Sequence, residues 1–234
     1  MAAVSDDALV TVPSRPVIFA CGALARDLRA VLRSSGLDDL VDVQYLPANL
    51  HNRPEHIVPS LRPLLVKATN EKRPVFIGYS DCGTGGALDA LLRDFPGVTR
   101  LSGAHCYEMF AGSELFAALH DDAPGTFYLT DYLALHFEAL VWTGLGLDRH
   151  PQLRGQYFGN YTRLVYLAQR DRADLLALAT AAASRLELPF ECVTVGRSSL
   201  RDGVVNALGA AALGAAAAAV AIDAVAWHDG SRRA

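Results

Sequence analysis

Short apolar runs alternate with helical patterns along the chain, and this alternation most limits the fold. The clearest unit is Arg73–Leu92, where the apolar run Val75–Tyr79 is followed by a glycine-rich turn and then by leucines at helical spacing. A short apolar run bounded by a proline is typical of a strand buried on both faces, and the leucine spacing indicates a helix. Strands that alternate with helices predict a parallel sheet covered by helices.

The same pattern recurs on both sides of this unit. From Tyr132 to Leu186 it changes, and the sequence there predicts three consecutive helices, at Tyr132–Leu145, Pro151–Arg170 and Arg172–Leu186. We therefore expect an α/β fold with an open, mostly parallel, Rossmann-like sheet, helices on both faces and a C-terminal helical layer. The predicted strands are Arg15–Ala20, Leu40–Leu46, Val75–Tyr79, Val98–Ser102, Thr126–Thr130 and Phe190–Val195.

The predicted domain organisation is simple. Residues 1–14 resemble a flexible arm, 15–203 form one α/β domain that contains the helical block 132–186, and 204–234 form an alanine-rich helix or tail. The apolar segment within that tail is long enough to cross a bilayer. Alanine is only weakly hydrophobic, however, and polar residues and glycines interrupt the segment. We expect a surface-packed helix or a poorly ordered tail in preference to a membrane helix.

Composition excludes several classes of function. The net charge is -4 and no basic stripe interleaved with aromatic residues occurs, so we expect no nucleic-acid partner. Four cysteines in 234 residues do not form a disulfide framework, and the N-terminus lacks the basic and apolar regions of a secretory signal. We therefore expect a cytoplasmic protein whose thiols are free for metal binding or catalysis.

Three cysteines follow predicted strands closely. Cys21, Cys82 and Cys106 each lie within a few residues of a strand end, whereas Cys192 lies inside a strand and is expected to pack in the core. Sites of open parallel sheets form beyond the carboxyl ends of the strands, so the three thiols are expected to converge. Three thiolates with an open fourth position would suit zinc or a [4Fe–4S] cluster, and the sequence leaves the two undecided.

Other polar residues near strand ends are candidates for catalysis. His51 and His105 could complete the metal site or transfer protons, and Glu108 and Asp131 could contact substrate or support the ligands. Each has a simpler structural role as well. A loop histidine is commonly solvated, Glu108 would favour a helix dipole, and Asp131 would cap the following helix.

The turn after Val75–Tyr79 supplies the candidate substrate contacts. It lacks the glycine spacing and the lysine of the known phosphate loops, so a dedicated nucleotide site is not expected. Its backbone N–H groups could still bind a carboxylate or phosphate of a small polar substrate. The candidate substrate-binding residues are Asp81, Gly83, Thr84, Gly85 and Tyr107.

Two other functions fit the same residues. In a metal-free enzyme, Cys82 at a helix N-terminus would be the nucleophile and His105 or His51 the base, although Asp81 would raise the thiol pKa. Alternatively, the chain could be a non-catalytic partner or chaperone whose helical block forms a protein interface.

Several short sequences, in order from about Pro16 to Gly203, are similar to those of the DUF1638 family, a domain of unknown function. The resemblance implies a link to corrinoid-dependent methyltransferases and to methyl or one-carbon metabolism, in which zinc commonly serves methyl transfer to a thiol. Three cysteines after strands are also similar to the arrangement in quinolinate synthase, where they hold an iron–sulfur cluster. The matching segments are Ala20–Leu24, Leu50–Glu55, Tyr79–Gly86, His105–Glu108, Leu129–Asp131 and Tyr157–Tyr161.

The leading hypothesis is a metal-dependent α/β enzyme that acts on a small polar substrate. Cys21, Cys82 and Cys106 are the expected metal ligands. Its expected partners are the small-molecule substrate, a corrinoid protein or methyltransferase, and further copies of the same chain.

Overall fold

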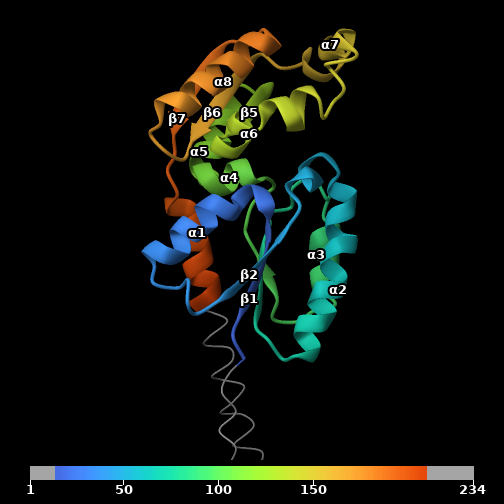
Figure 1. Ribbon diagram of the computed structural model, residues 1–234, viewed down its shortest axis with the longest axis vertical. Coiled ribbons are helices and arrows are strands. Elements are labelled where there is room, and N and C mark those ends of the chain that lie inside the picture. The colour runs from blue at the N-terminus through green and yellow to red at the C-terminus, as the bar shows by residue number, and fades with distance from the viewer. Residues whose placement is uncertain (1–13, 210–234) are drawn as a thin grey trace, which may run out of the picture.

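The protein contains two parallel β-sheets, one in each half of the chain, with helices packed on both (Figure 1). The computed structural model describes residues 14–209, so the predicted N-terminal arm and most of the alanine-rich tail lie outside the described residues. The predicted α/β class and its parallel, Rossmann-like strands are confirmed. The strands are divided between two sheets of four and three strands.

The first sheet orders its strands so that the cysteine-bearing segments are adjacent. β1 lies between β2 and β3, and β4 pairs with β3, all in parallel. The first four residues of β1 and all of β3 are buried, as the apolar runs predicted. Parallel pairing brings the carboxyl ends of all four strands to one edge. The strands are β1 (Val17–Cys21), β2 (Asp42–Leu46), β3 (Val75–Gly78) and β4 (Thr99–Arg100).

Helices cover both faces of this sheet. On one face α1 packs through Leu28 and Val31, and on the other α2 and α3 pack through Leu61 and Leu88. Short 3₁₀ turns follow the strand ends and position the loops of the site. These elements are η1 (Gly22–Leu24), α1 (Ala25–Ser34), η2 (Ala48–Asn52), η3 (Pro54–His56), α2 (Ile57–Asn70) and α3 (Ala87–Leu92).

The second sheet has the order β5-β6-β7 and is also parallel. One face packs on α6 and α8, and the other on α4 and α5. In Figure 1, α4 lies between the two sheets. The elements are α4 (Cys106–Ala111), α5 (Ser113–Asp122), β5 (Thr126–Thr130), α6 (Asp131–Leu135), the π-helical turn η4 (Glu138–Trp142), η5 (Pro151–Leu153), α7 (Arg154–Phe158), β6 (Arg163–Ala168), α8 (Ala173–Leu186) and β7 (Phe190–Thr194).

The predicted helix Pro151–Arg170 is wrong in its second half, where the central strand β6 lies. Residues 164–168 are all buried between β5, β7 and the flanking helices. A short fully buried run has no polar face, so its periodicity cannot distinguish a strand from a helix. The predicted helical block 132–186 therefore contains the middle strand of a sheet.

A helix after β7 returns the chain to the first sheet. It spans residues 198–209 within the described part, and Leu200, Val204 and Leu208 pack in the same core as α1. At its start Arg197 pairs with the buried carboxylate of Asp27 on α1. We call residues 14–104 with this helix the first lobe, and residues 105–196 the second lobe. Among the described residues, no helix has the length and apolarity needed to cross a membrane.

Candidate functional site

The three predicted cysteines lie at the carboxyl edge of the first sheet. Cys21 is the last residue of β1, Cys82 follows the end of β3, and Cys106 begins α4 after the short strand β4. Because β1, β3 and β4 are neighbours in the sheet, three distant sequence segments meet there. All three thiols are free and partly buried, whereas Cys192 is exposed. The sequence analysis expected Cys192 in the core, but its side chain faces the surface of the edge strand β7.

The charges of these thiols influence one another. Burial raises the pKa of Cys82 to about 12, and the charge of Cys21 is the next cause. The pKa of Cys106 is raised well above its usual value by burial and then by Cys82 and Cys21. Burial also raises the pKa of Cys21, although the Ala23 N–H group, the nearby Tyr79 hydroxyl and the Leu24 N–H group oppose the shift. All three thiols are therefore protonated at neutral pH unless a cation compensates their charge.

The donor set suits a soft metal chemically, since thiolates are the ligands that zinc and iron–sulfur clusters prefer. Within residues 14–209, however, no group of three or more His, Cys, Asp or Glu side chains is arranged to hold a metal ion. The fit to a metal therefore rests on the identity of the donors and on their convergence at one edge.

Cys82 has an unusual backbone conformation. Its φ is 51°, in the left-handed region, where a non-glycine residue costs roughly 1–2 kcal/mol. Hydrogen bonds hold the segment there: the Asp81 and Cys82 N–H groups donate to the carbonyls of Gly103 (3.1 Å) and Ala104 (2.9 Å). A strained conformation fixed by its surroundings is characteristic of functional positions.

Asp81 organises the glycine turn. Its carboxylate accepts hydrogen bonds from the Thr84 hydroxyl (2.6 Å) and from the N–H groups of Gly85 (3.0 Å) and Gly86 (2.9 Å). Burial raises the Asp81 pKa, but these hydrogen bonds outweigh it and lower the pKa overall. Of the predicted substrate contacts, Asp81, Thr84 and Gly85 thus bond to one another, while Gly83 lies beside Pro54.

The two candidate histidines lie near each other at this edge. His51 is in η2, and His105 precedes α4 as its N-cap residue. Both are accessible to solvent, yet desolvation by the surrounding protein lowers the His51 pKa, and the charge of His105 lowers it further. His51 is therefore neutral at pH 7 and can accept a proton.

Tyr107 and Glu108 connect the site to the second lobe. The Tyr107 ring packs against Tyr128 of β5 with centroids 5.5 Å apart, and burial and then Cys106 raise its pKa. Glu108 accepts hydrogen bonds from the Ala104 N–H (2.8 Å) and the Ser113 hydroxyl (2.9 Å). Glu108 thus holds the loop that carries His105 and Cys106.

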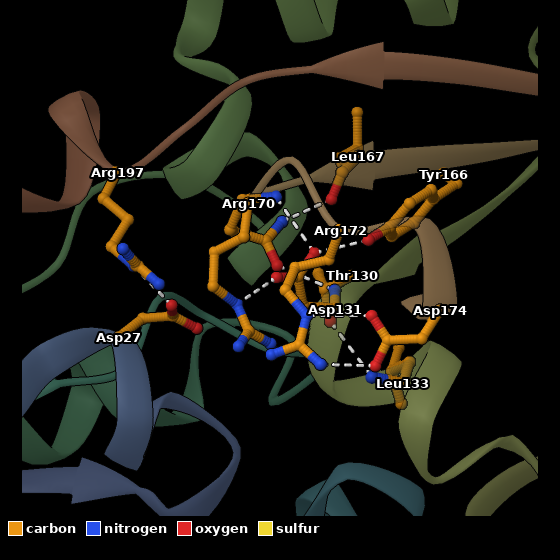
Figure 2. A network of polar contacts seen from close by, with 11 residues as sticks. Asp27, Thr130, Asp131, Leu133, Tyr166, Leu167, Arg170, Arg172, Asp174 and Arg197 are labelled. Carbon is orange, nitrogen blue, oxygen red and sulfur yellow. Dashed lines mark hydrogen bonds and ion pairs between the residues drawn. The ribbon is translucent and has the colours of Figure 1, made fainter. Parts of the chain in front are cut away.

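Asp131 lies at the carboxyl edge of the other sheet. Its buried carboxylate accepts hydrogen bonds from the Tyr166 hydroxyl (2.6 Å) and the Arg170 guanidinium (2.7 Å), as Figure 2 shows. It also accepts one from the Gln169 N–H (3.0 Å). The predicted N-cap role belongs to Thr130, whose hydroxyl accepts from the Leu133 N–H. Asp131 therefore forms hydrogen bonds within the second sheet, and the structure does not bring it together with Cys21, Cys82 and Cys106.

Sequence analysis missed two tyrosines at the cysteine site. Tyr79, taken as the end of a buried strand, is 2% exposed, and its hydroxyl has no hydrogen-bond partner among the described residues. Tyr132 is the second residue of α6, which contacts η1 next to Cys21. The position of Tyr79 opposite Cys21 follows from strand register, whereas Tyr132 arrives through packing of the second lobe.

The lobes are also joined at the rim of the site. The Asn52 side-chain amide, next to His51, donates a 2.7 Å hydrogen bond to the Leu140 carbonyl in the π-helical turn. π-Helical turns are frequent near functional sites. The cysteine edge of the first lobe therefore faces α6 and η4 of the second.

A family model described as "Protein of unknown function (DUF1638)" matches residues 45–203. The match covers Cys82 and Cys106 but begins after Cys21. Neither the curated proteins nor the solved structures contain a match to this chain.

Proposed function

Because the chain belongs to the DUF1638 family, whose description assigns no reaction, we propose its function from the cysteine site. We propose that Cys21, Cys82 and Cys106 bind zinc or a [4Fe–4S] cluster and that the loaded protein is an enzyme for a small polar substrate. The observation that carries the proposal is the convergence of three partly buried thiols from three strand ends, where the charge of Cys21 acts on both Cys82 and Cys106.

The raised pKa values favour a metal over a free nucleophile. With a pKa of about 12, Cys82 is deprotonated in roughly one molecule in 10⁵ at pH 7, and the thiolate is the reactive form. A bound cation would stabilise the three thiolates that burial disfavours. In a metal-free cysteine enzyme, Arg100 would offer Cys82 little compensating charge, because it is already paired with Asp89.

The chain's own residues would position and protonate the substrate. When bound, the metal would supply Lewis-acid chemistry or an activated thiol. His51, neutral at pH 7, would accept a proton at the rim of the site, and His105 lies beside it. Asp81 and Glu108 would maintain the two loops that carry the cysteines.

The cellular setting is part of the same proposal. Free, partly buried cysteines suit a reducing compartment, and we propose the cytoplasm. A role in methyl or one-carbon metabolism would fit a thiolate metal site, with a corrinoid protein or methyltransferase as partner. We also propose that copies of this chain associate with one another.

Metal analysis of anaerobically purified protein tests the proposal. We expect about one equivalent of zinc, or about four of iron with matching sulfide, per chain. Cys21→Ala, Cys82→Ala and Cys106→Ala should each lose most of the metal, whereas Cys192→Ala, at an exposed thiol, should retain it. Circular dichroism would establish that each variant is folded.

Three results would reject the metal site. They are less than about a tenth of an equivalent of zinc or iron, cysteine variants with wild-type metal content, or equal loss in Cys192→Ala. Stoichiometric alkylation of Cys82 with loss of activity in Cys82→Ser alone would instead indicate the metal-free enzyme. Co-purification with a protein partner and no turnover would indicate the non-catalytic role.

A further inference from the structure

A cavity of about 220 Å³ lies between α1 and the helix that spans residues 198–209, and the two helices pack side by side in Figure 1. At roughly 30 Å³ per molecule, this volume equals that of about seven waters. It is smaller than the roughly 300 Å³ of the smallest pockets for drug-sized ligands, so it suits a small ion or one end of a larger molecule. The lining residues are Ala30, Val31, Ser34, Arg197, Ser198 and Arg201.

The polar lining of this cavity is basic. Two of the lining residues are arginines and two are serines, and no carboxylate of the described residues lines it. The single acid of α1, Asp27, is buried, and the Arg197 Nε donates a 2.5 Å hydrogen bond to its carboxylate (Figure 2). Asp27 therefore fixes the direction of the Arg197 guanidinium, and the cavity favours an anion.

Arg197 makes fewer hydrogen bonds than a comparably buried arginine of the second lobe. The side chain of Arg163 is 17% exposed and donates through all three guanidinium nitrogens, at distances of 2.8–3.0 Å. The side chain of Arg197 is 27% exposed and, within residues 14–209, donates through Nε alone. Its two terminal amino groups therefore remain available as a planar pair of donors, the geometry with which arginine binds oxyanions.

Arg201 and Ser198 follow Arg197 in the same helix and supply further donors. Arg201 is one helical turn further along, and its N–H donates to the Arg197 carbonyl at 2.9 Å. Its guanidinium pairs with Asp202 at 3.0 Å, but both side chains are more than half exposed, and such surface pairs are weak. Arg201 can therefore turn to an anion in the cavity. The exposed hydroxyl of Ser198 is a third donor in the lining.

We propose that this cavity binds a phosphate group, either as free phosphate or at the end of a small phosphorylated molecule, through Arg197, Ser198 and Arg201. A phosphate group offers at least three strong acceptor oxygens, enough for two guanidinium groups and a hydroxyl, whereas a carboxylate offers two. No cysteine of the described residues lines the cavity, and the site requires no metal. The inference is therefore independent of the function proposed for the cysteines.

Isothermal titration calorimetry of the full-length protein, in a phosphate-free buffer of low ionic strength, tests this site. The ligands are inorganic phosphate, glycerol 3-phosphate and acetate. Arg197→Lys keeps a cation that pairs with Asp27 but removes the fork of terminal amino groups. Arg201→Gln removes the second guanidinium and leaves that pair intact. The matched control is Arg149→Gln, because Arg149 also pairs with a neighbouring aspartate, Asp148, and lies outside the cavity.

We expect the wild-type protein to bind both phosphate compounds saturably. Arg197→Lys should weaken this binding by at least about tenfold, the effect of one lost hydrogen bond to a charged group. Arg201→Gln should weaken it by about fivefold, because its guanidinium is exposed. Arg149→Gln should match wild type. Circular dichroism would establish folding, and Arg201→Gln alone would decide the test if Arg197→Lys were unfolded.

The two phosphate compounds distinguish the source of the phosphate group. Tighter binding of glycerol 3-phosphate would identify a phosphorylated molecule as the ligand, and equal or weaker binding would identify phosphate itself. Four results would overturn the proposal. They are no saturable binding to wild type, acetate binding as tight as that of phosphate, wild-type affinity in the folded Arg197→Lys and Arg201→Gln variants, or an equal loss in Arg149→Gln.

Discussion

The two sheets end in opposite ways at their carboxyl edges. In the second sheet, the Asp131 carboxylate accepts three hydrogen bonds, and its N–H donates to the Gln169 side chain at 2.7 Å. In the first sheet, three thiols with raised pKa values lie beside the Tyr79 hydroxyl, which lacks a partner among the described residues. The Asp131 carboxylate is thus fully paired, whereas the Tyr79 hydroxyl beside the thiols has no partner among the described residues.

This difference separates a stabilising edge from a binding edge. Both sheets are parallel and both would offer a crevice beyond their strands. A carboxylate whose hydrogen bonds are all made has no lone pair left for a ligand. Unpaired buried donors and thiols lower stability, and proteins retain them where a ligand supplies the missing hydrogen bond or charge. The comparison predicts that equivalent substitutions at the two edges change stability in opposite directions.

The largest expected effect is at the saturated edge. Asp131→Ala leaves the Arg170 guanidinium and the Tyr166 hydroxyl without their acceptor, and we expect a loss of about 3–5 kcal/mol in the free energy of unfolding. Chemical denaturation would measure it. Asp174→Ala removes a carboxylate of a fully exposed pair with Arg172 and is the control, with little change expected. Equal losses in the two variants would contradict a stabilising role of the Asp131 network.

The same tyrosine substitution at the two edges gives the sharpest contrast. Tyr166→Phe removes a hydrogen bond to a buried carboxylate and should cost about 1.5–3 kcal/mol. Tyr79→Phe removes an unpaired buried hydroxyl, and we expect unchanged stability or a gain of up to about 1 kcal/mol. Thermal and urea unfolding of both variants would check the difference. A loss in Tyr79→Phe as large as that in Tyr166→Phe would show that the Tyr79 hydroxyl is paired in solution.

Most of the fold could be predicted from the sequence where strands are bounded clearly. The strands at 17–21, 75–78 and 126–130 lie within one or two residues of their predicted bounds, because prolines, glycines or polar residues flank each apolar run. β6 could not be predicted, since its fully buried run of five residues, 164–168, carries no periodicity. Without β6, the segment 132–186 was interpreted as a helical block, and β5 and β7 were assigned to the same sheet as the other strands.

The residues of the candidate site also differ in how well the sequence could predict their positions. The grouping of Cys21, Cys82 and Cys106 follows from parallel topology, which depends on local sequence patterns. Asp131 lies on a separate sheet, and Tyr132 reaches the first lobe only because the two lobes pack together. No local sequence pattern indicates how the lobes pack. The left-handed conformation of Cys82 was equally hidden, because only the hydrogen bonds to Gly103 and Ala104 impose it.

The strain at Cys82 predicts an effect of about 1 kcal/mol. At a φ of 51°, Cys82→Gly should be more stable than Cys82→Ala by about this amount, since glycine avoids the left-handed cost but loses more chain entropy. At Cys106, the first residue of α4, the order should reverse, with alanine more stable than glycine. Urea denaturation of the four variants measures both differences. The same order at both positions would contradict the assigned conformation of Cys82.

The smallest expected effect concerns the turn that holds the first edge. The hydrogen bonds of Asp81 outweigh its burial and lower its pKa, so the carboxylate adds stability above its unfolded-state pKa. That stability is lost as the pH falls through the lower folded-state pKa. Asp81→Asn should cost less than about 1 kcal/mol at pH 7, because asparagine still accepts hydrogen bonds.

The difference between wild type and Asp81→Asn should shrink in acid. Unfolding measured from pH 7 to pH 2 should show the two stability curves converging below about pH 4, near the ordinary pKa of an aspartate. Asp38→Asn, at an exposed aspartate, is the control, and its curve should stay parallel to that of wild type. If Asp81→Asn also remained parallel, the charge of the Asp81 carboxylate would contribute nothing to stability, and the lowered pKa would be contradicted.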